Sequence, residues 1–316
     1  MEKKKIMIGL GTFERPKMLQ SCLDALSLIL LPAETEVILL VADNSFEKSS
    51  QSLFESFKEK IPFHSTYMLV KERGIVKMRN AILEKALTFD TDYLVFVDDD
   101  ELVSKTWLTD LYSFLLKHKA DVVSGMVKRK LPEATPKWLI EGGFFNILSY
   151  SSAKVLNETS TSNVIFDFKK LVVASGLRFD ERLNFFGTSD SLFFRQAYRK
   201  GAKILWSNEG VVEEIFPSSR ANKGWLLQRK FRKGVTQIKR ETILHGSLIS
   251  YLNGFASLVY QMLNYALQKV KLLKTKGEEL KVESLKADLT LYYIKGLIDG
   301  MFSKNPFEEY KQKHGY

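Results

Sequence analysis

The sequence contains little cysteine and shows no secretory signal at its start. Cys22 is the only cysteine among 316 residues, so an intrachain disulfide is excluded and a reducing compartment is favoured. Residues 1–5 are rich in lysine and lead into a short apolar run, which predicts a first strand rather than a signal peptide. We therefore expect a cytoplasmic protein.

Several other patterns are also absent. The sequence has no internal repeat and no low-complexity tract. The Gly-rich fingerprint of dinucleotide-binding proteins is missing from the region after the first predicted strand. No recognisable nucleic-acid-binding motif is present, which argues against a basic protein that binds nucleic acid.

The composition is that of an ordinary soluble protein with an excess of positive charge. Hydrophobic residues make up 45% and charged residues 27%, and the length allows a sizeable core. The formal net charge of +10 favours an anionic partner, such as a nucleotide, a nucleic acid or an acidic lipid. An unremarkable basic protein fits the charge equally well.

The first hundred residues alternate between apolar runs of strand length and segments with helical spacing. This alternation predicts βαβ units, a parallel sheet and right-handed crossovers, and therefore a nucleotide-binding-like half. A long irregular segment at 131–160 could border a cleft. The predicted strands are residues 6–12, 36–42, 65–70, 93–97, 121–125, 163–168, 204–206 and 211–214. The predicted helices are residues 16–29, 47–60, 73–87, 105–118 and 189–200.

Three consecutive aspartates, Asp98, Asp99 and Asp100, follow the apolar run 93–97. At the carboxyl end of a buried parallel strand they would lie where open α/β sheets bind their ligands. Adjacent carboxylates repel one another unless donors or a cation neutralise them, and a divalent ion shared with substrate phosphates is a natural neutraliser. A solvated acidic loop or a helix N-terminus would explain the triplet equally well.

Three further positions extend this hypothesis. A second strand ends on Asp43, and the βαβ order predicts that Asp43 and the acidic triplet lie side by side at one edge of the sheet. There Asp43 could bind a base or a ribose. Arg79, in the helix before the triplet, could pair with phosphate or be a surface arginine. A turn at 185–189 leads into a helix with Asp190 in its first turn, a pattern that N-terminal capping also explains.

The motifs of this chain, taken together and in their order along the sequence, resemble those of family 2 glycosyltransferases with the GT-A fold. They most closely resemble those of the bacterial succinoglycan-type branch that acts in exopolysaccharide assembly. The resemblance covers residues 6 to about 234. The motifs that carry it are Gly11-Thr12-Phe13-Glu14-Arg15-Pro16, Asp43-Asn44-Ser45, Arg73-Gly74, Arg79-Asn80, Asp98-Asp99-Asp100, Thr161-Ser162-Asn163, Phe179-Asp180-Glu181, Gly187-Thr188-Ser189-Asp190 and Glu214-Ile215-Phe216-Pro217-Ser218-Ser219-Arg220.

The resemblance implies an inverting transfer of a sugar from a nucleotide-diphospho sugar, with UDP as the expected nucleotide and Mn²⁺ or Mg²⁺ as the cofactor. Asp190 matches the catalytic base, which takes the proton from the acceptor hydroxyl. Asp100 matches the aspartate that reaches the metal. The other matched residues are Thr12, Arg15 and Asp43 at the nucleoside, Asp98 and Asp99 at ribose and phosphate, and Arg79 at the donor.

The chain departs from the family pattern in two places. Thr and Ser occupy positions 188–189 before Asp190, where relatives often have glutamate. This changes the surroundings of the base and keeps its carboxylate. Many relatives supply a later histidine to the metal, whereas the matching loop here offers Glu213 and Glu214. We assign Glu214 to the metal, and a structural role would explain it equally well.

A basic stretch follows this loop and supplies three more candidates for the donor site: Arg220, Trp225 and Arg229. The arginines could close over the diphosphate, and Trp225 could stack on a sugar. A solvated helix face and buried aromatic packing are the alternatives for these residues.

Residues 246–268 contain no charged residue, which raises the question of a membrane span. Polar residues recur along the segment and its apolar residues fall on one face, so the pattern predicts an amphipathic helix. That helix could pack on the rest of the chain, form a homodimer, or lie in a membrane interface beside lysines 269, 271, 274 and 276. Residues 289–302 could complete a helical hairpin.

We therefore predict an α/β protein with the GT-A fold: Rossmann-like, with a mostly parallel central sheet flanked by helices and a C-terminal helical extension. Residues 1–234 form the catalytic domain, with a nucleotide-binding half at 1–100 and an acceptor half at 101–234. Residues 235–316 form the helical region.

The predicted enzyme is a metal-dependent hexosyltransferase of surface polysaccharide biosynthesis. It acts on a glycan or lipid-linked saccharide, in the cytoplasm or at the inner face of the cell membrane, and has no nucleic-acid partner. One alternative is a sugar-phosphate nucleotidyltransferase, whose usual Gly-rich, lysine-bearing loop is missing. The other is a non-enzymatic basic nucleic-acid-binding protein.

Overall fold

The computed structural model describes residues 3–48 and 50–303. The chain divides into two compact units. The first comprises Met1–Lys130, Ile147–Asn184 and Ser189–Ile215, and the second comprises Leu131–Asn146, Phe185–Thr188 and Phe216–Tyr316.

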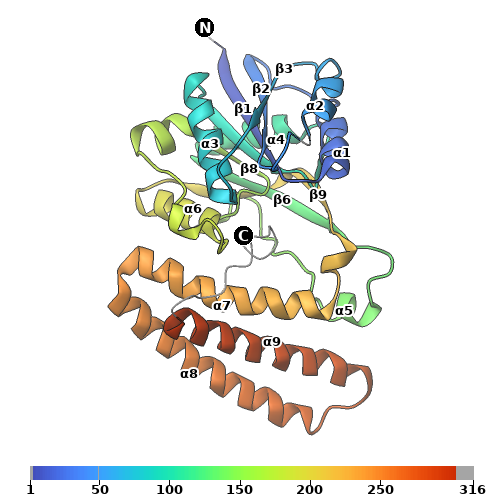
Figure 1. Cartoon of the computed structure of the whole chain (residues 1–316), viewed down its shortest axis with the longest axis vertical. Coiled ribbons are helices and arrows are strands. Elements are labelled where there is room, and N and C mark those ends of the chain that lie inside the picture. The colour runs from blue at the N-terminus through green and yellow to red at the C-terminus, as the bar shows by residue number, and fades with distance from the viewer. Residues whose placement is uncertain (1–2, 49, 304–316) are drawn as a thin grey trace. The chain divides into compact units, whose positions relative to one another are not determined.

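A nine-stranded sheet forms the centre of the first unit (Figure 1). The strand order is β3-β2-β1-β4-β8-β6-β9-β5, and β7 also pairs with β9. As the βαβ pattern predicts, β1 is parallel to β2 and β4, and β2 is parallel to β3. In the second half, β8 is antiparallel to both β4 and β6. The strands are β1 Lys4–Thr12, β2 Thr35–Asp43, β3 His64–Leu69, β4 Tyr93–Asp98, β5 Glu101–Val103, β6 Val122–Lys130, β7 Val155–Leu156, β8 Val164–Asp167 and β9 Ile204–Ile215.

Helices cover both faces of this sheet. α1, α2 and α4 pack on one face through an apolar cluster that includes Leu23, Phe54 and Trp107. α3 and α6 pack on the other face through a cluster that includes Ile82 and Phe193. Burial on both faces explains why the central strands are nearly continuous apolar runs, and it confirms the predicted α/β class. The helices are α1 Pro16–Leu26, α2 Gln51–Lys58, α3 Ile75–Thr88, α4 Trp107–His118 and α6 Ser189–Arg199.

The second half of the sheet differs in detail from the prediction. The two strands expected at 204–206 and 211–214 are one strand, β9, which carries a register shift opposite Gly125 and Val127 of β6. The segment predicted to be irregular contains the short helix α5, Lys137–Glu141, and strand β7. Strand β5 was not predicted, because three residues are too few to show a period.

Three long helices form most of the second unit: α7 Lys223–His245, α8 Ser247–Leu272 and α9 Gly277–Phe302. Glycines let α7 and α9 approach closely, because a Cβ on Gly296 would collide with the backbone of Phe231 and one on Gly234 with the backbone of Tyr293. These helices confirm the C-terminal helical extension, and α7 runs through residue 234 without a break. The functional boundaries at residues 100 and 234 stay predictions. Within residues 3–48 and 50–303, no helix has the length and apolarity needed to cross a membrane.

Candidate active site

Three strands of the first unit carry polar side chains at their carboxyl ends. Thr12 ends β1, Asp43 ends β2 and Asp98 ends β4. In the sheet register Thr12 is the partner of Asp43, and Gly11 is the partner of Asp98. The two acidic strand ends therefore share one edge of the sheet, with β1 between them rather than directly side by side as expected.

The end of β1 and the segment after it bind the acidic triplet. The Thr12 hydroxyl donates to an Asp99 oxygen at 2.8 Å. The Arg15 guanidinium lies 3.2 Å from the other Asp99 oxygen and 3.5 Å from Asp100. Burial raises the pKa of Asp99 to about 6 against the lowering effect of Arg15. The fold thus brings Thr12 and Arg15 into one cluster with the triplet, and their contact with the nucleoside stays a prediction.

Glu101 is a fourth acidic member of this cluster, and sequence reasoning missed it. Its carboxylate accepts the backbone N–H of Asp98 at 3.0 Å and the hydroxyl of Ser162. Burial raises the pKa of Asp98 and of Glu101 well above the usual carboxyl range. The one signal in the sequence was the unbroken acidic run from 98 to 101, but the contact with Ser162 depends on tertiary structure.

The acidic cluster lies within the electrostatic range of two arginines, Arg15 and Arg79. Four carboxyl groups lie at residues 98–101, and the Arg15 guanidinium forms ion pairs with two of them, Asp99 and Asp100. Among residues 3–48 and 50–303, no group of three or more His, Cys, Asp or Glu side chains is placed to hold a metal by itself. Adjacent carboxyl oxygens are hard donors and nevertheless fit a divalent ion that takes one or two protein carboxylates and completes its shell with substrate phosphates.

The Asp43 carboxylate is occupied by donors of its own loop and of β3. One oxygen accepts the backbone N–H and the hydroxyl of Ser45. The other accepts the backbone N–H of Ser50 at 3.1 Å and the Tyr67 hydroxyl at 2.8 Å. Since Asp43 is fully buried, its observed role is to fix the loop after β2, and its contact with a nucleoside stays a prediction.

Two asparagines tie the start of α3 to this edge of the sheet. The Asn44 side chain donates to the carbonyls of Val70 and Glu72, and it accepts the Gly74 N–H at 3.0 Å. Asn184 accepts the Val76 N–H at 3.0 Å and thereby satisfies a free donor at the helix start.

Gly74 is required at this junction on two grounds. Its φ of 112° is one that side chains rarely allow, and a Cβ there would collide with the Asn184 amide. Asn184 was missed by sequence reasoning, because a capping residue more than a hundred positions away leaves no local pattern.

Arg79 and Asp190 both act on the acidic cluster. Arg79 is buried and donates to the Ser189 hydroxyl at 2.9 Å, which links α3 to the first residue of α6. Burial is the main reason that the pKa of Asp98 is raised, and the negative charge of Asp190 raises it further. The positive charge of Arg79 lowers the pKa of Asp98. The fold thus brings Arg79 and Asp190 within electrostatic range of the triplet.

The backbone before α6 is unusual. Gly187 has a φ of 80° and Thr188 a φ of 63°, both in the left-handed region. For threonine, a β-branched residue, this conformation costs about 1–2 kcal/mol. An N-cap residue is normally extended, so Thr188 does not have cap geometry. Asp190 itself is half-buried in the first turn of α6.

The two residues assigned to the metal have different surroundings. Asp100 belongs to the acidic cluster, and its backbone carbonyl accepts the N–H of Ile215 at 2.8 Å. Glu214, which precedes Ile215 in β9, accepts two hydrogen bonds from Arg129, at 2.8 Å and 2.7 Å. An ion pair with Arg129 therefore stabilises Glu214, and its role as a metal ligand stays a prediction.

The remaining candidates lie in the second unit. Trp225 packs edge-on against Phe216, with 5.3 Å between ring centroids. The Arg229 guanidinium lies 5.0 Å from the Trp225 ring centroid, one turn along α7. Arg220 ends a short 3-10 turn. The assignment of Arg220, Trp225 and Arg229 to the donor stays a prediction.

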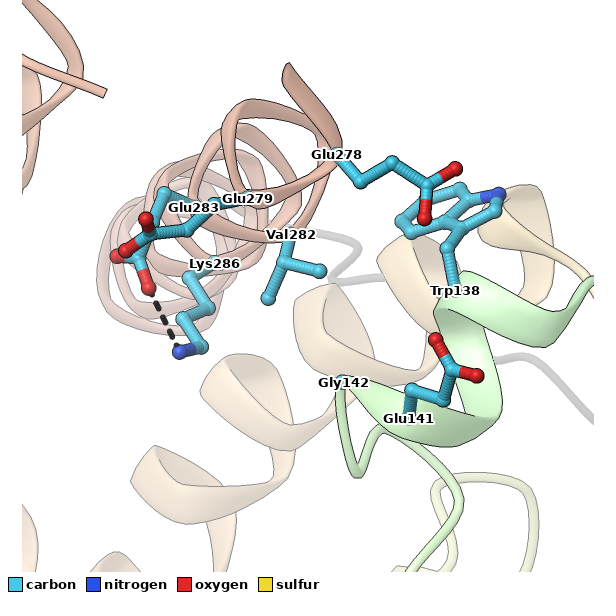
Figure 2. A pocket seen from close by; sticks show the side chains of 8 residues that line it. All are labelled: Trp138, Glu141, Gly142, Glu278, Glu279, Val282, Glu283 and Lys286. Carbon is cyan, nitrogen blue, oxygen red and sulfur yellow. Dashed lines mark hydrogen bonds and ion pairs between the residues drawn. The ribbon is translucent and has the colours of Figure 1, made fainter. Parts of the chain in front are cut away.

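The second unit also contains a cavity of about 420 Å³ between α5 and the first turns of α9 (Figure 2). Trp138 and Val282 contribute its apolar surface, and Glu283 forms an ion pair with Lys286 at 2.8 Å. Four glutamates and one lysine line the cavity, so its net charge is negative. It therefore does not suit a diphosphate, and we do not assign it to the donor.

Comparison with known proteins gives one family and a consistent set of structures. The model of glycosyl transferase family 2 matches residues 8–171. The succinoglycan biosynthesis protein ExoM of Rhizobium meliloti strain 1021 is 31% identical over 251 residues, which cover 79% of this chain and 76% of that protein.

Two solved structures share the fold. The mannosyltransferase PcManGT from Pyrobaculum calidifontis, in complex with GDP-Man and Mn²⁺, aligns with a TM-score of 0.63 at 18% identity and covers 96% of this chain and 88% of its own. Residues 1–349 of Staphylococcus aureus TarS, in complex with UDP, align with a TM-score of 0.52 at 19% identity over 99% of this chain and 92% of that one. These likenesses confirm the predicted GT-A fold.

Proposed function

This chain belongs to glycosyl transferase family 2, and from that premise we propose that it transfers a sugar, with inversion, from a nucleotide-diphospho sugar to a saccharide acceptor in polysaccharide biosynthesis. The observation that carries the proposal is the family match over residues 8–171, which includes the acidic cluster at the carboxyl ends of β1 and β4. Family membership decides against both the nucleotidyltransferase and the nucleic-acid-binding alternatives.

We propose that the acidic cluster binds the donor diphosphate through a divalent cation. Asp100 is the residue that we expect to hold the ion, with Glu214 as a second candidate, and the donor phosphates would complete the coordination. When bound, the ion would stabilise the charge that develops on the leaving diphosphate. The four adjacent carboxyl groups at 98–101, all hard oxygen donors, support this assignment. In that arrangement Thr12 and Arg15 would fix Asp99 for contact with ribose or phosphate.

We propose Asp190 as the general base. Its half-buried position in α6, its electrostatic effect on Asp98 and the left-handed Thr188 before it support this role. The carboxylate would take the proton from the acceptor hydroxyl as that oxygen attacks the anomeric carbon, and the bond to the diphosphate would break. Arg79 would lie near the leaving phosphate, positioned by its hydrogen bond to Ser189.

We expect UDP to be the nucleotide, and a donor panel tests this. Thermal shifts should be measured with UDP-, GDP- and dTDP-sugars, with and without Mn²⁺. A UDP-sugar with Mn²⁺ should stabilise the protein by about 2.7 kcal/mol at a hundredfold excess over Kd, and the shift should shrink without the metal. Equal stabilisation by all three nucleotides would contradict UDP selectivity, and a shift unaffected by chelation would contradict metal dependence.

The proposal extends to the acceptor and the site of action. We propose a glycan or a lipid-linked saccharide as the acceptor, with residues 101–234 supplying most of its site and residues 1–100 most of the donor site. For the C-terminal helices the sequence predicts either a homodimer or contact with the inner face of the membrane, and the exposed side of α8 separates these two roles.

A further inference from the structure

Helix α8 presents its apolar side to solvent. A row of large apolar side chains along α8 and its C-cap is exposed, from 43% at Tyr251 to 84% at Leu273. A soluble amphipathic helix normally buries this side. The exposed residues are Leu248, Ile249, Tyr251, Leu252, Phe255, Val259, Tyr260, Met262, Leu263, Leu267, Val270 and Leu273.

The polar side of the same helix faces inward. Ser250 is fully buried, and its hydroxyl donates to the Ile238 carbonyl of α7 at 3.0 Å and accepts from Thr242 at 2.9 Å. Gly254 is buried against Ile238 and Met301, whose side chains would have to shift to admit a Cβ. Further along this side, the partly buried polar residues are Ser257, Gln261, Asn264 and Gln268, and Leu258 and Tyr265 are partly buried beside them. The apolar row is therefore not the surface through which α8 packs on its own unit.

The charges carried by α8 and the segment after it are of one sign. From residue 246 to residue 277 the sequence has no Asp or Glu, and its four charged residues are lysines 269, 271, 274 and 276. At 100° per residue, Lys269 and Lys271 lie on the two sides of Val270 and so flank the apolar row. Lys271 also forms an ion pair with Glu283 at 3.1 Å.

We propose that this apolar face of α8 binds the surface of an anionic phospholipid bilayer, with the helix lying in the plane of the interface. The 26-residue helix is about 39 Å long, and its apolar row runs along it, as in helices that lie at interfaces rather than span them. Lysines that flank the row reach the phosphate level, and Tyr251 and Tyr260 suit the boundary between headgroups and acyl chains.

The end of α9 extends the same surface. The Tyr251 hydroxyl donates to the Met301 carbonyl at 2.7 Å, which places the C-terminal turn of α9 beside the start of α8. Ile298 and Phe302 of that turn are also exposed. A second copy of the chain fits this surface less well. If the α8 faces of two copies packed together, their lysines would approach one another, and segment 246–277 has no acidic residue to pair with them.

Vesicle flotation of the full chain tests the proposal without any assay of sugar transfer. The wild-type protein should float with vesicles of phosphatidylcholine and phosphatidylglycerol and bind vesicles of phosphatidylcholine alone less well. The pair Leu252→Glu and Leu263→Glu should lower partition at least about a hundredfold, since burying each leucine contributes roughly tenfold or more. The pair Lys269→Gln and Lys274→Gln should lower it roughly fivefold for each lysine on anionic vesicles.

Matched variants on the first unit separate this effect from a general change in surface polarity. Leu148→Glu replaces an equally exposed leucine, and Lys117→Gln replaces an exposed lysine of α4, so both should float like the wild type. Sedimentation velocity without lipid should give a monomer for every variant. Wild type that does not float with anionic vesicles would overturn the proposal. The proposal would also be overturned by a wild-type protein that is a dimer, if the double substitution Leu252→Glu and Leu263→Glu made it a monomer and left vesicle binding unchanged.

Discussion

Replacing Asp190 by asparagine is expected to lower the rate of sugar transfer by about 10²- to 10⁴-fold and to leave donor affinity close to that of the wild type. Asparagine is nearly isosteric with aspartate and keeps hydrogen-bonding capacity, but it cannot take a proton from the acceptor hydroxyl. A base acts in the transition state, so kcat should fall while the donor Kd barely changes. The measurement is steady-state transfer to the true acceptor, together with donor binding by calorimetry.

Asp110 supplies a matched control for this experiment. Like Asp190 it lies in the first turn of a helix in the first unit, α4, and it accepts a hydrogen bond from Thr106 at 2.7 Å. Asp110→Asn removes the same favourable interaction with a helix N-terminus without touching the acidic cluster. It should cost a few tenths of a kcal/mol in stability and leave turnover intact. If Asp190→Asn behaved in the same way, Asp190 would be a structural residue and the base would have to be sought elsewhere.

Replacing Asp100 by alanine is expected to abolish the part of donor binding that depends on Mn²⁺. At a ligand concentration of a hundred times the wild-type Kd, the stabilisation of about 2.7 kcal/mol should fall to the small value seen without metal. The unliganded fold should survive. The negative charge of Asp100 repels the neighbouring carboxylates and so raises the pKa values of Asp98, Asp99 and Glu101, and the substitution removes this repulsion. Thermal shifts with and without Mn²⁺ give both quantities.

Asp24→Ala is the control for this variant. Asp24 is an exposed aspartate on α1, so its loss changes the net charge equally and leaves the cluster alone. We expect wild-type metal dependence from it. An Asp100→Ala protein that still binds a UDP-sugar with unchanged metal dependence would show that the ion is held by other residues.

The sequence predicted the parts of this molecule that depend on local pattern. Apolar runs that end on Asp43 and Asp98 located two strand ends, and the alternation of strands with helices placed them at one edge of the sheet. Thr12 and Arg15 were assigned to the same site through the family resemblance, and the fold brings both to Asp99.

The parts that were missed depend on contacts between distant segments. Glu101 owes its burial to the fold and to Ser162, and Asn184 satisfies the start of α3 from far along the chain. The periodicity of α8 predicted an apolar stripe, but it could not show that small and polar residues such as Ser250 and Gly254 would form the packed side. An apolar stripe has the same period whether it is buried by the chain itself or by a binding partner.

Inverting transfer from a nucleotide-diphospho sugar fixes the anomeric configuration of the product, and that configuration tests the proposed mechanism most directly. The full chain should be incubated with an α-linked UDP-sugar and Mn²⁺, and turnover should be followed by proton NMR from the first minutes, before free sugar anomers equilibrate. Hydrolysis by water reports the same stereochemistry, so the measurement does not require the natural acceptor. A β-configured product is the predicted result, and an α-configured product would contradict the mechanism in which Asp190 activates the attacking hydroxyl.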